Sequence, residues 1–244
     1  MCVDYARNVI AGGSYYGSIG TFGNVVLPIA SNADALVWKL TVDGTTLWAL
    51  RGGGQYADEV RSVAVDHTGA VYATGNVQFS GSNARVTFGH VSVTRSSNFM
   101  NKPFLWKVNG AGTTMWAIVG DGASDSYDTT NAVSVDITGN VFVAGRVRSA
   151  SFTFGGSVAA SANGETTMWK FNQSGVGIWN AQILDGYNVM DVTADATGGA
   201  AAMFMRDRTA VLWKVNAQGT TAWSVVGGGT TSNDPDDLHM GEAR

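Results

Sequence analysis

The eight tryptophans of this 244-residue chain fall into four pairs, and the two members of every pair are ten residues apart. The first tryptophan of each pair is followed by lysine, and glycine stands six residues after it. The four segments read VWKLTVDGTTLW, LWKVNGAGTTMW, MWKFNQSGVGIW and LWKVNAQGTTAW. The repeated residues are Trp38 and Trp48, Trp106 and Trp116, Trp169 and Trp179, Trp213 and Trp223, with Lys39, Lys107, Lys170 and Lys214. Such a repeat constrains the fold, because each copy is one unit that must bury its apolar surface against its neighbours.

A second repeated block alternates with the first. It reads CVDYARNVIAGG from Cys2, VAVDHTGAVYATG from Val63, VSVDITGNVFVAG from Val133 and VTADATGGAAAMF from Val192. Each copy holds an aspartate before a short turn, and these are Asp4, Asp66, Asp136 and Asp195. Aspartate can accept hydrogen bonds from turn amides, and glycine accepts the positive φ that tight turns need. The block therefore predicts a hairpin in which the aspartate forms the turn and has no catalytic role.

A short Thr-Phe-Gly block lies between the two longer blocks in the first three copies, at residues 21–23, 87–89 and 153–155, and is missing from the fourth. The strand-like runs around every turn are rich in β-branched and aromatic residues, and no segment shows a helical period. The repeat thus predicts four strands per unit, in units of approximately 1–57, 58–127, 128–187 and 188–244.

Four-stranded units that are apolar on both faces are typical of β-propellers, in which neighbouring blades cover each blade. We therefore predict an all-β, single-domain propeller with four recognisable blades over residues 1–244. It forms either a closed four-bladed ring or a segment of a longer repeat array. A β-helix or another solenoid is the alternative architecture, although its rungs are usually shorter than this unit.

The chain resembles the β-propeller repeat family abbreviated SBBP. The segment that carries the resemblance is DALVWKLTVDGTTLWALRGGGQYADEVRSVAVDHTGAVYATG, from Asp34 to Gly75, and the pattern recurs over Pro103–Gly145 and more loosely over Thr166–Phe204. The arrangement is also similar to that of NHL-type propellers, which implies that the strand before the repeated aspartate is innermost. The resemblance implies an extracellular or cell-surface binding scaffold without general catalytic chemistry. Phe204 departs from the pattern, because glycine ends this block in the other three copies.

The composition limits the possible partners. Only 14% of the residues are charged, against about 25% in average proteins, and the formal net charge is −4. This leaves no basic face for nucleic acid, and no apolar run approaches the length of a membrane span. A single cysteine offers neither an internal disulfide nor a zinc cluster. We expect a protein partner or self-assembly, with no nucleic-acid partner, no membrane insertion and no metal site.

The sequence gives little support to catalysis. Histidine occurs three times in the chain and is not repeated at one motif position, and no nucleophile elbow, phosphate loop or metal-ligand spacing is present. We therefore predict that the protein is not an enzyme, with a hydrolase or lyase site as the unfavoured alternative. Acidic residues gather before the inner strands, as at Asp58, Glu59 and Asp128, but without the spacing of a calcium loop. We expect solvated turns there and no cofactor, with calcium as the weak alternative.

The repeated lysines and tryptophans each allow two interpretations. The lysines could form a ring that captures an anion, but a repeated strand position favours stems packed between units and ammonium groups paired within the chain. The tryptophans could stack on sugars, yet their regular spacing favours a core role.

Irregular residues are the better candidates for ligand contacts. The tyrosines in predicted loops are Tyr15, Tyr16, Tyr56, Tyr127 and Tyr187. The last three each lie in the link to the next unit, and a glycan-binding propeller lectin that uses the loop aromatics is the alternative function. Assembly contacts are expected in the long segments 13–33, 76–103 and 146–165, since long loops on a rigid scaffold often carry binding. The second of these holds the interface candidates Arg85, His90, Arg95 and Phe99. Asn172 begins the sequon Asn-Gln-Ser and is a glycosylation candidate.

Overall fold

The computed structural model describes residues 1–17, 19–28, 32–122, 128–159, 165–184, 188–206, 208–229 and 238–240. Within these ranges the regular elements are all β-strands, and helices are absent. The same residues contain no helix long and apolar enough to cross a membrane. The prediction of an all-β fold is therefore confirmed.

The strands form four repeat units, each an antiparallel meander of four principal strands. Unit 1 contains β1 (Cys2–Val3), β2 (Val9–Tyr15), β5 (Asp34–Leu40) and β6 (Thr46–Gly53). Unit 2 contains β7 (Glu59–Val65), β8 (Val71–Phe88), β9 (Val91–Val108) and β10 (Thr114–Val119). Unit 3 contains β12 (Thr129–Val135), β13 (Val141–Val147), β16 (Glu165–Phe171) and β17 (Gly177–Ile183). Unit 4 contains β18 (Val189–Ala194), β19 (Ala200–Arg206), β20 (Thr209–Val215) and β21 (Thr221–Gly229), with β22 (Leu238–Met240) paired to β21.

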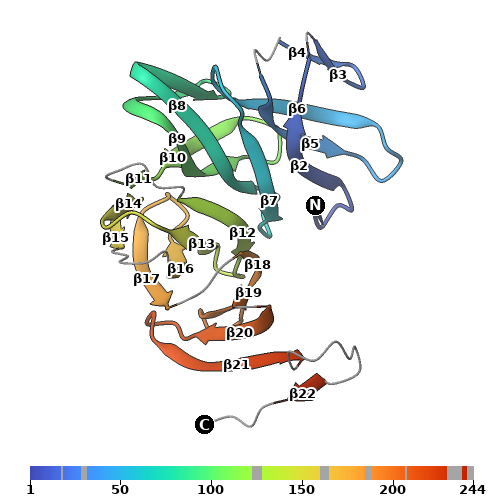
Figure 1. Ribbon diagram of the computed structural model, residues 1–244. Coiled ribbons are helices and arrows are strands. Elements are labelled where there is room, and N and C mark those ends of the chain that lie inside the picture. The colour runs from blue at the N-terminus through green and yellow to red at the C-terminus, as the bar shows by residue number, and fades with distance from the viewer. Residues whose placement is uncertain are drawn as a thin grey trace.

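The units follow one another from the blue N-terminal unit to the orange and red C-terminal unit (Figure 1). A short β6–β8 pairing, Gly52 to Phe88 and Gly53 to Thr87, links units 1 and 2 into one eight-stranded sheet. Units 3 and 4 form separate sheets. The described strands do not close into a ring, and apolar clusters fill the spaces between successive units.

The first strands of units 2, 3 and 4 (β7, β12 and β18) lie next to one another, and side chains join them to the neighbouring unit. Ser62 Oγ accepts a hydrogen bond from Val133 N at 3.2 Å, and Ser134 Oγ accepts one from Ala194 N at 3.0 Å. These strands belong to different sheets and do not pair with one another, so the serine hydroxyls provide the hydrogen bonds between their backbones.

The repeated aspartates form the first hairpin turn of each unit. Asp66 Oδ1 accepts hydrogen bonds from Thr68 N at 2.9 Å and Ala70 N at 3.0 Å, and Asp136 makes the equivalent bonds. Burial raises the pKa of both carboxyl groups, but side-chain hydrogen bonds, from Thr68 to Asp66 and from Asn140 and Thr138 to Asp136, outweigh it together with the backbone ones. The pKa of each therefore lies below its usual value. The structure thus places Asp4, Asp66, Asp136 and Asp195 as turn-forming residues.

The long segments expected as loops contain hairpins that pack on the core. Residues 76–103 continue β8 and β9 as one extended hairpin, while β3 (Gly20–Phe22) pairs with β4 (Val25–Leu27). In unit 3, β14 (Phe152–Phe154) pairs with β15 (Ser157–Ala159) and with β11 (Asp121–Gly122). The Thr-Phe-Gly block ends the first strand of each hairpin, and its phenylalanine contacts the first tryptophan of the unit. The ring centroids are 5.5 Å apart for Phe22 and Trp38, 5.4 Å for Phe88 and Trp106, and 5.7 Å for Phe154 and Trp169.

A threonine eight residues downstream accepts a hydrogen bond from the indole N–H of the first tryptophan. Nε1 donates to the hydroxyl oxygen at 3.0 Å in three units, for the pairs Trp38–Thr46, Trp106–Thr114 and Trp213–Thr221. Unit 3 has Gly177 at this position, and the buried Trp169 Nε1 has no hydrogen-bond partner. A threonine cannot simply be added there, because a Cβ on Gly177 would lie 2.6 Å from Ser157 Cβ.

We predict that Thr114→Val lowers the free energy of unfolding by about 1–3 kcal/mol, because the buried Trp106 indole N–H would lose its acceptor. Urea unfolding followed by tryptophan fluorescence measures the change. The control Thr113→Val changes an exposed neighbour and should shift stability by no more than about 0.5 kcal/mol. Equal stability of Thr114→Val and the parent would show that this hydrogen bond contributes nothing.

Candidate functional site

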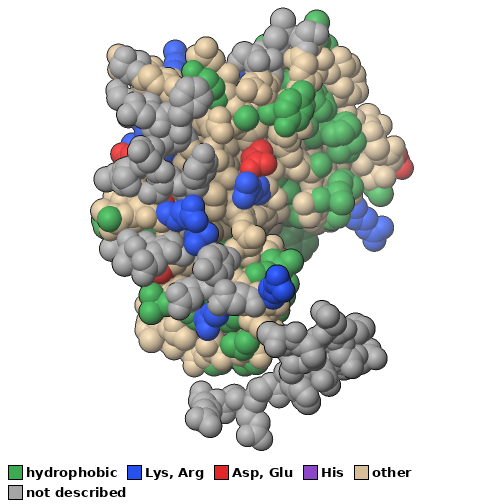
Figure 2. Space-filling model, in the orientation of Figure 1, with side chains coloured by type: hydrophobic (Ala, Val, Ile, Leu, Met, Phe, Trp, Pro, Cys, Tyr) green, Lys and Arg blue, Asp and Glu red, His purple; other side chains and the backbone are tan. Residues whose placement is uncertain are grey.

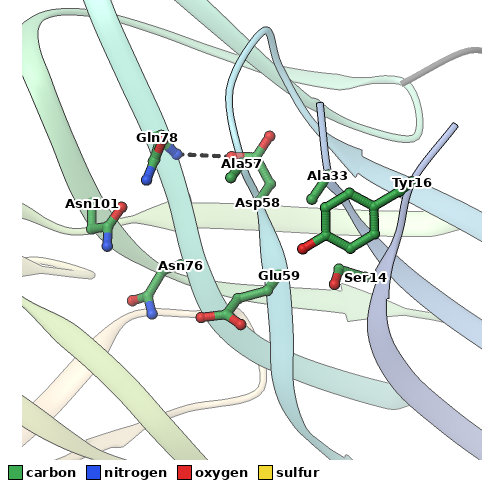
Figure 3. Close-up of a pocket in the computed structure, with 9 residues that line it drawn as sticks. All are labelled: Ser14, Tyr16, Ala33, Ala57, Asp58, Glu59, Asn76, Gln78 and Asn101. Atoms are coloured by element: carbon green, nitrogen blue, oxygen red, sulfur yellow. Dashed lines mark hydrogen bonds between the residues drawn. The ribbon is translucent and has the colours of Figure 1, made fainter. Parts of the chain in front are cut away.

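A polar pocket of about 170 Å³ lies where unit 1 meets unit 2. Ser14 and Tyr16 line it on one side, Asn76, Gln78 and Asn101 line it on the other, and Asp58 and Glu59 lie between them (Figure 3). Ala33 and Ala57 complete the lining. The Tyr16 side chain is 74% exposed, so an aromatic ring stands at the rim of a site that is otherwise rich in hydroxyl, amide and carboxyl groups.

Asp58 forms the buried base of this pocket. It is 1% exposed, and its two oxygens accept hydrogen bonds from Gly54 N at 2.7 Å and Gln78 N at 2.8 Å; the bond from Gln78 is drawn in Figure 3. Burial raises the pKa of Asp58 to about 7, although the two amide donors act in the opposite direction. Asp58 therefore fastens the start of β7 to β8.

Asp128 has the same role one unit later. It is fully buried and accepts hydrogen bonds from Arg148 N at 2.7 Å and Ser149 N at 3.0 Å. The expectation that the acidic links are solvated turns is thus wrong for Asp58 and Asp128. Both carboxyl groups can be buried because backbone amides, and for Asp128 also the Ser149 hydroxyl, donate hydrogen bonds to their oxygens.

A second pocket, of about 160 Å³, lies over the first strands of units 2, 3 and 4. Its lining residues are Arg61, Thr129, Asn131, Arg146, Arg148 and Asn188. The exposed Glu59–Arg61 ion pair, at 2.6 Å, joins it to the first pocket, and Arg61 Nη1 donates to Asn131 Oδ1 at 2.9 Å. We call the lining residues of both pockets together the polar strip. Acidic and basic side chains meet near the middle of the face shown in Figure 2.

β-Bulges direct two side chains into the second pocket. The pairing register shifts between Val60 and Ser62 in β7 and between Thr130 and Ala132 in β12, which makes Arg61 and Asn131 the extra residues. A bulge turns a side chain away from the regular alternation and is common beside functional sites.

Glycine is required opposite each of these two bulges. A Cβ on Gly75 would lie 2.0 Å from Glu59 O, and one on Gly145 would lie 1.9 Å from Thr129 O. The glycine that ends the second repeated block therefore makes room for the bulged backbone. Unit 4 has a register shift in the same place, between Val189 and Asp191, but Phe204 stands at the glycine position.

The structure brings one of the five predicted tyrosines, Tyr16, into a pocket. Tyr56 is half-buried and does not line either pocket, while Tyr127 and Tyr187 lie outside the described residues. Tyr15, expected in a loop, is instead a buried residue at the end of β2. A further signal for the strip is that Arg61 and Asn131 are polar residues at the same repeat position, five residues before the repeated aspartate.

The interface candidates on the β8–β9 hairpin have different surroundings. Arg85 and His90 are exposed near its tip, and Arg85 donates to Ser92 Oγ at 2.5 Å. Arg95 pairs with Asp121 and donates to Val119 O at 3.0 Å, so it links the hairpin to β10 and β11. The Phe99 side chain lies outside the described residues.

The four repeated lysines are paired within the chain. Lys39 pairs with Asp4 at 2.9 Å, and Lys214 pairs with Asp195. Lys107 donates to a turn carbonyl of unit 3, Gln173 O, at 3.2 Å, and Lys170 donates to one of unit 4, Gly198 O, at 2.7 Å. The repeated lysines therefore link strands within a unit or link one unit to the next.

Asn172 is also a turn-forming residue. Its Oδ1 accepts hydrogen bonds from Ser174 N at 2.9 Å and Val176 N at 3.0 Å. Asn109 and Asn216 make the equivalent bonds in units 2 and 4, where no sequon is present. The turn geometry thus explains the asparagine, and glycosylation stays a prediction.

The part of the chain that the structure describes holds no group of three or more His, Cys, Asp or Glu side chains placed to bind a metal ion. The weak calcium alternative thus has no candidate ligand cluster among those residues.

Comparisons with known proteins identify no family for this chain. No family model and no curated protein matches it. One similar solved structure is a protein of unknown function from Bacteroides caccae, with 9% sequence identity and a TM-score of 0.44. The match covers 93% of this chain and 70% of that chain.

Asp58 gives a pH dependence with a defined sign. An unfolded aspartate has a pKa of about 4, whereas that of Asp58 in the folded chain is about 7. Between these values the folded chain holds a proton that the unfolded chain has released. This contribution to the free energy of unfolding therefore falls as the pH rises through this window, by at most about 1.4 kcal/mol per pH unit, and levels off above it.

We predict that Asp58→Asn removes this decline, so that its unfolding free energy relative to the parent rises between pH 4 and pH 7. Urea unfolding at several pH values measures it. Asp43→Asn, on an exposed turn, should keep the parent slope. If the unfolding free energy of Asp58→Asn declines with pH as much as that of the parent, the decline comes from other titrating groups.

Proposed function

We propose that this chain is a non-catalytic binding scaffold of the β-propeller type, extracellular or at the cell surface, and that the polar strip is its ligand site. The observation that carries the proposal is the convergence of Arg61, Asn131 and Asn188 from three consecutive units onto one pocket. Repeated bulges direct the first two of these side chains there. A rigid scaffold that presents polar groups from successive repeats is suited to binding.

The propeller architecture is supported by the order of the strands. Each unit is a four-stranded meander, consecutive first strands lie side by side, and apolar clusters fill the space between units. These features agree with the resemblance to SBBP-type repeats and with NHL-like blades, whose innermost strand precedes the repeated aspartate. On this proposal, each unit is a blade.

The acidic groups of the strip favour binding over catalysis. Asp58 accepts hydrogen bonds from the amides of Gly54 and Gln78, and Glu59 forms an ion pair with Arg61. A general acid or base needs a carboxyl group that can reach a reacting atom. Both carboxyl groups already have partners within the chain.

A glycan is the ligand class that the first pocket favours. The exposed Tyr16 ring offers a face for a sugar, while Ser14, Asn76, Gln78 and Asn101 offer hydroxyl and amide groups for its hydroxyls. Protein sites for such ligands combine an apolar or aromatic surface with a few well-placed polar groups. This supports the lectin as the second candidate function, through Tyr16 in place of Tyr56, Tyr127 and Tyr187.

A glycan array with neutral and acidic oligosaccharides, followed by calorimetry on any ligand found, tests the proposal. We expect Tyr16→Ala and Arg61→Ala each to weaken binding about tenfold or more, as loss of a central contact does. The matched control is Tyr5→Ala, since Tyr5 is 81% exposed and lies outside both pockets.

Two results would contradict these assignments. An array without any bound glycan would reject the lectin. Binding of any ligand that survives both strip variants but is lost in Arg85→Ala would place the site on the β8–β9 hairpin and reject the polar strip.

A further inference from the structure

The second tryptophan of each pair makes the same contact with the following unit. Its Nε1 donates to a carbonyl oxygen in the next Trp-Lys hairpin turn, for Trp48 to Gly110 O at 3.1 Å, Trp116 to Gln173 O at 3.1 Å and Trp179 to Ala217 O at 2.9 Å. These bonds mark three successive interfaces of one kind.

The glycine of each receiving turn lies against the indole ring. A Cβ on Gly112 would be 2.7 Å from Trp48, one on Gly175 would be 3.2 Å from Trp116, and one on Gly219 would be 2.9 Å from Trp179. Each interface therefore has a donor half, which carries the second tryptophan, and a receiver half, which carries the turn.

Unit 4 exposes a donor half. Trp223, the second tryptophan of the fourth pair, is 44% exposed, whereas Trp48 of the first pair is 8% exposed. Leu212 is 43% exposed, although the residues at its position in units 1 to 3 are fully buried; these are Val37, Leu105 and Met168. Met203 is exposed as well, whereas its counterpart Ala144 in unit 3 is fully buried.

Unit 1 exposes a receiver half. The space beside Gly44 is open, with no atom within 4 Å of a Cβ placed there. Val42, which corresponds to the acceptor residues of the other turns, is 68% exposed, and Val3 is 57% exposed. Trp38 is only partly buried, whereas the other first tryptophans are fully buried; these are Trp106, Trp169 and Trp213.

We propose that copies of this chain associate head to tail, with the donor half of unit 4 seated on the receiver half of unit 1 of a second copy. A second copy is the partner that fits, because each chain exposes one donor half and one receiver half of the interface that its own units already form. Trp223 would donate to Val42 O of the next copy, and its ring would cover Gly44. The contact is heterologous, so it builds rings or open filaments.

This inference is independent of the ligand proposal and changes the expected location of assembly contacts. The segments 13–33, 76–103 and 146–165 were expected to carry them. Where they are described, these segments contain hairpins that pack against their own units, whereas the faces of the terminal units are apolar and exposed. Exposed apolar patches of this kind are typical of protein–protein contacts.

Sedimentation velocity over about a hundredfold range of protein concentration tests the proposal, because association follows mass action. We expect the parent to shift to larger species as the concentration rises. Trp223→Ala and Val3→Glu should each raise the dissociation constant about tenfold or more. Both side chains are exposed, so circular dichroism should show the parent fold. Met115→Ala, which removes a 54% exposed side chain in unit 2, should associate like the parent.

Mixing the two variants tests the polarity of the contact. A Trp223→Ala chain keeps its receiver half, and a Val3→Glu chain keeps its donor half. An equimolar mixture should form dimers that neither variant forms alone, and these dimers should not grow further. A parent protein that stays monomeric at every concentration would overturn the proposal. This includes a monomer in which units 1 and 4 of the same chain contact each other. A mixture without dimers, or variants that associate like the parent, would also overturn it.

Discussion

Contact between the second tryptophan of one unit and the hairpin turn of the next sets the spacing of the whole molecule. The indole N–H reaches a carbonyl of that turn at 2.9–3.1 Å in three successive interfaces. A glycine in the turn lets the backbone lie against the ring; Gly112, for example, combines a φ of +85° with its closeness to Trp48. Since one geometry is repeated, the first strands of successive units come side by side and create the polar strip.

The first tryptophan has a different task, which is to hold the unit itself together. In units 1, 2 and 4 its indole nitrogen bonds to a threonine of the adjacent strand, and in units 1 to 3 its ring packs against the phenylalanine of an inserted hairpin. Buried indoles need both a partner for the N–H group and close packing for the ring. The inserted hairpins are therefore part of the core.

The polar strip depends on local departures from regular pairing. Bulges at Arg61 and Asn131 interrupt the alternation of β7 and β12, and Gly75 and Gly145 provide the space that the bulged backbone needs. Asp58, buried under the neighbouring pocket, fastens the same region to β8. The site thus combines a repeated backbone feature with side chains that differ from unit to unit, which is how a repeat protein can acquire one specific ligand.

The sequence by itself determined the strand content, the four units and the turn residues. These depend on local chemistry, namely an aspartate or asparagine that accepts turn amides, a glycine at positive φ, and apolar residues on both faces of short strands. The pairing of the lysines within the chain was also predictable, because a repeated strand position signals a structural role.

Only the tertiary structure decided which polar residues meet. Asn76 and Asn101 meet because β8 pairs with β9, and Tyr16 shares their pocket because unit 1 packs on unit 2. The burial of Asp58 and Asp128 likewise depends on amide donors 20 residues later in the chain. Whether an apolar face is covered also depends on its neighbours, so Trp48 is buried between units whereas Trp223, with the same local sequence pattern, is exposed.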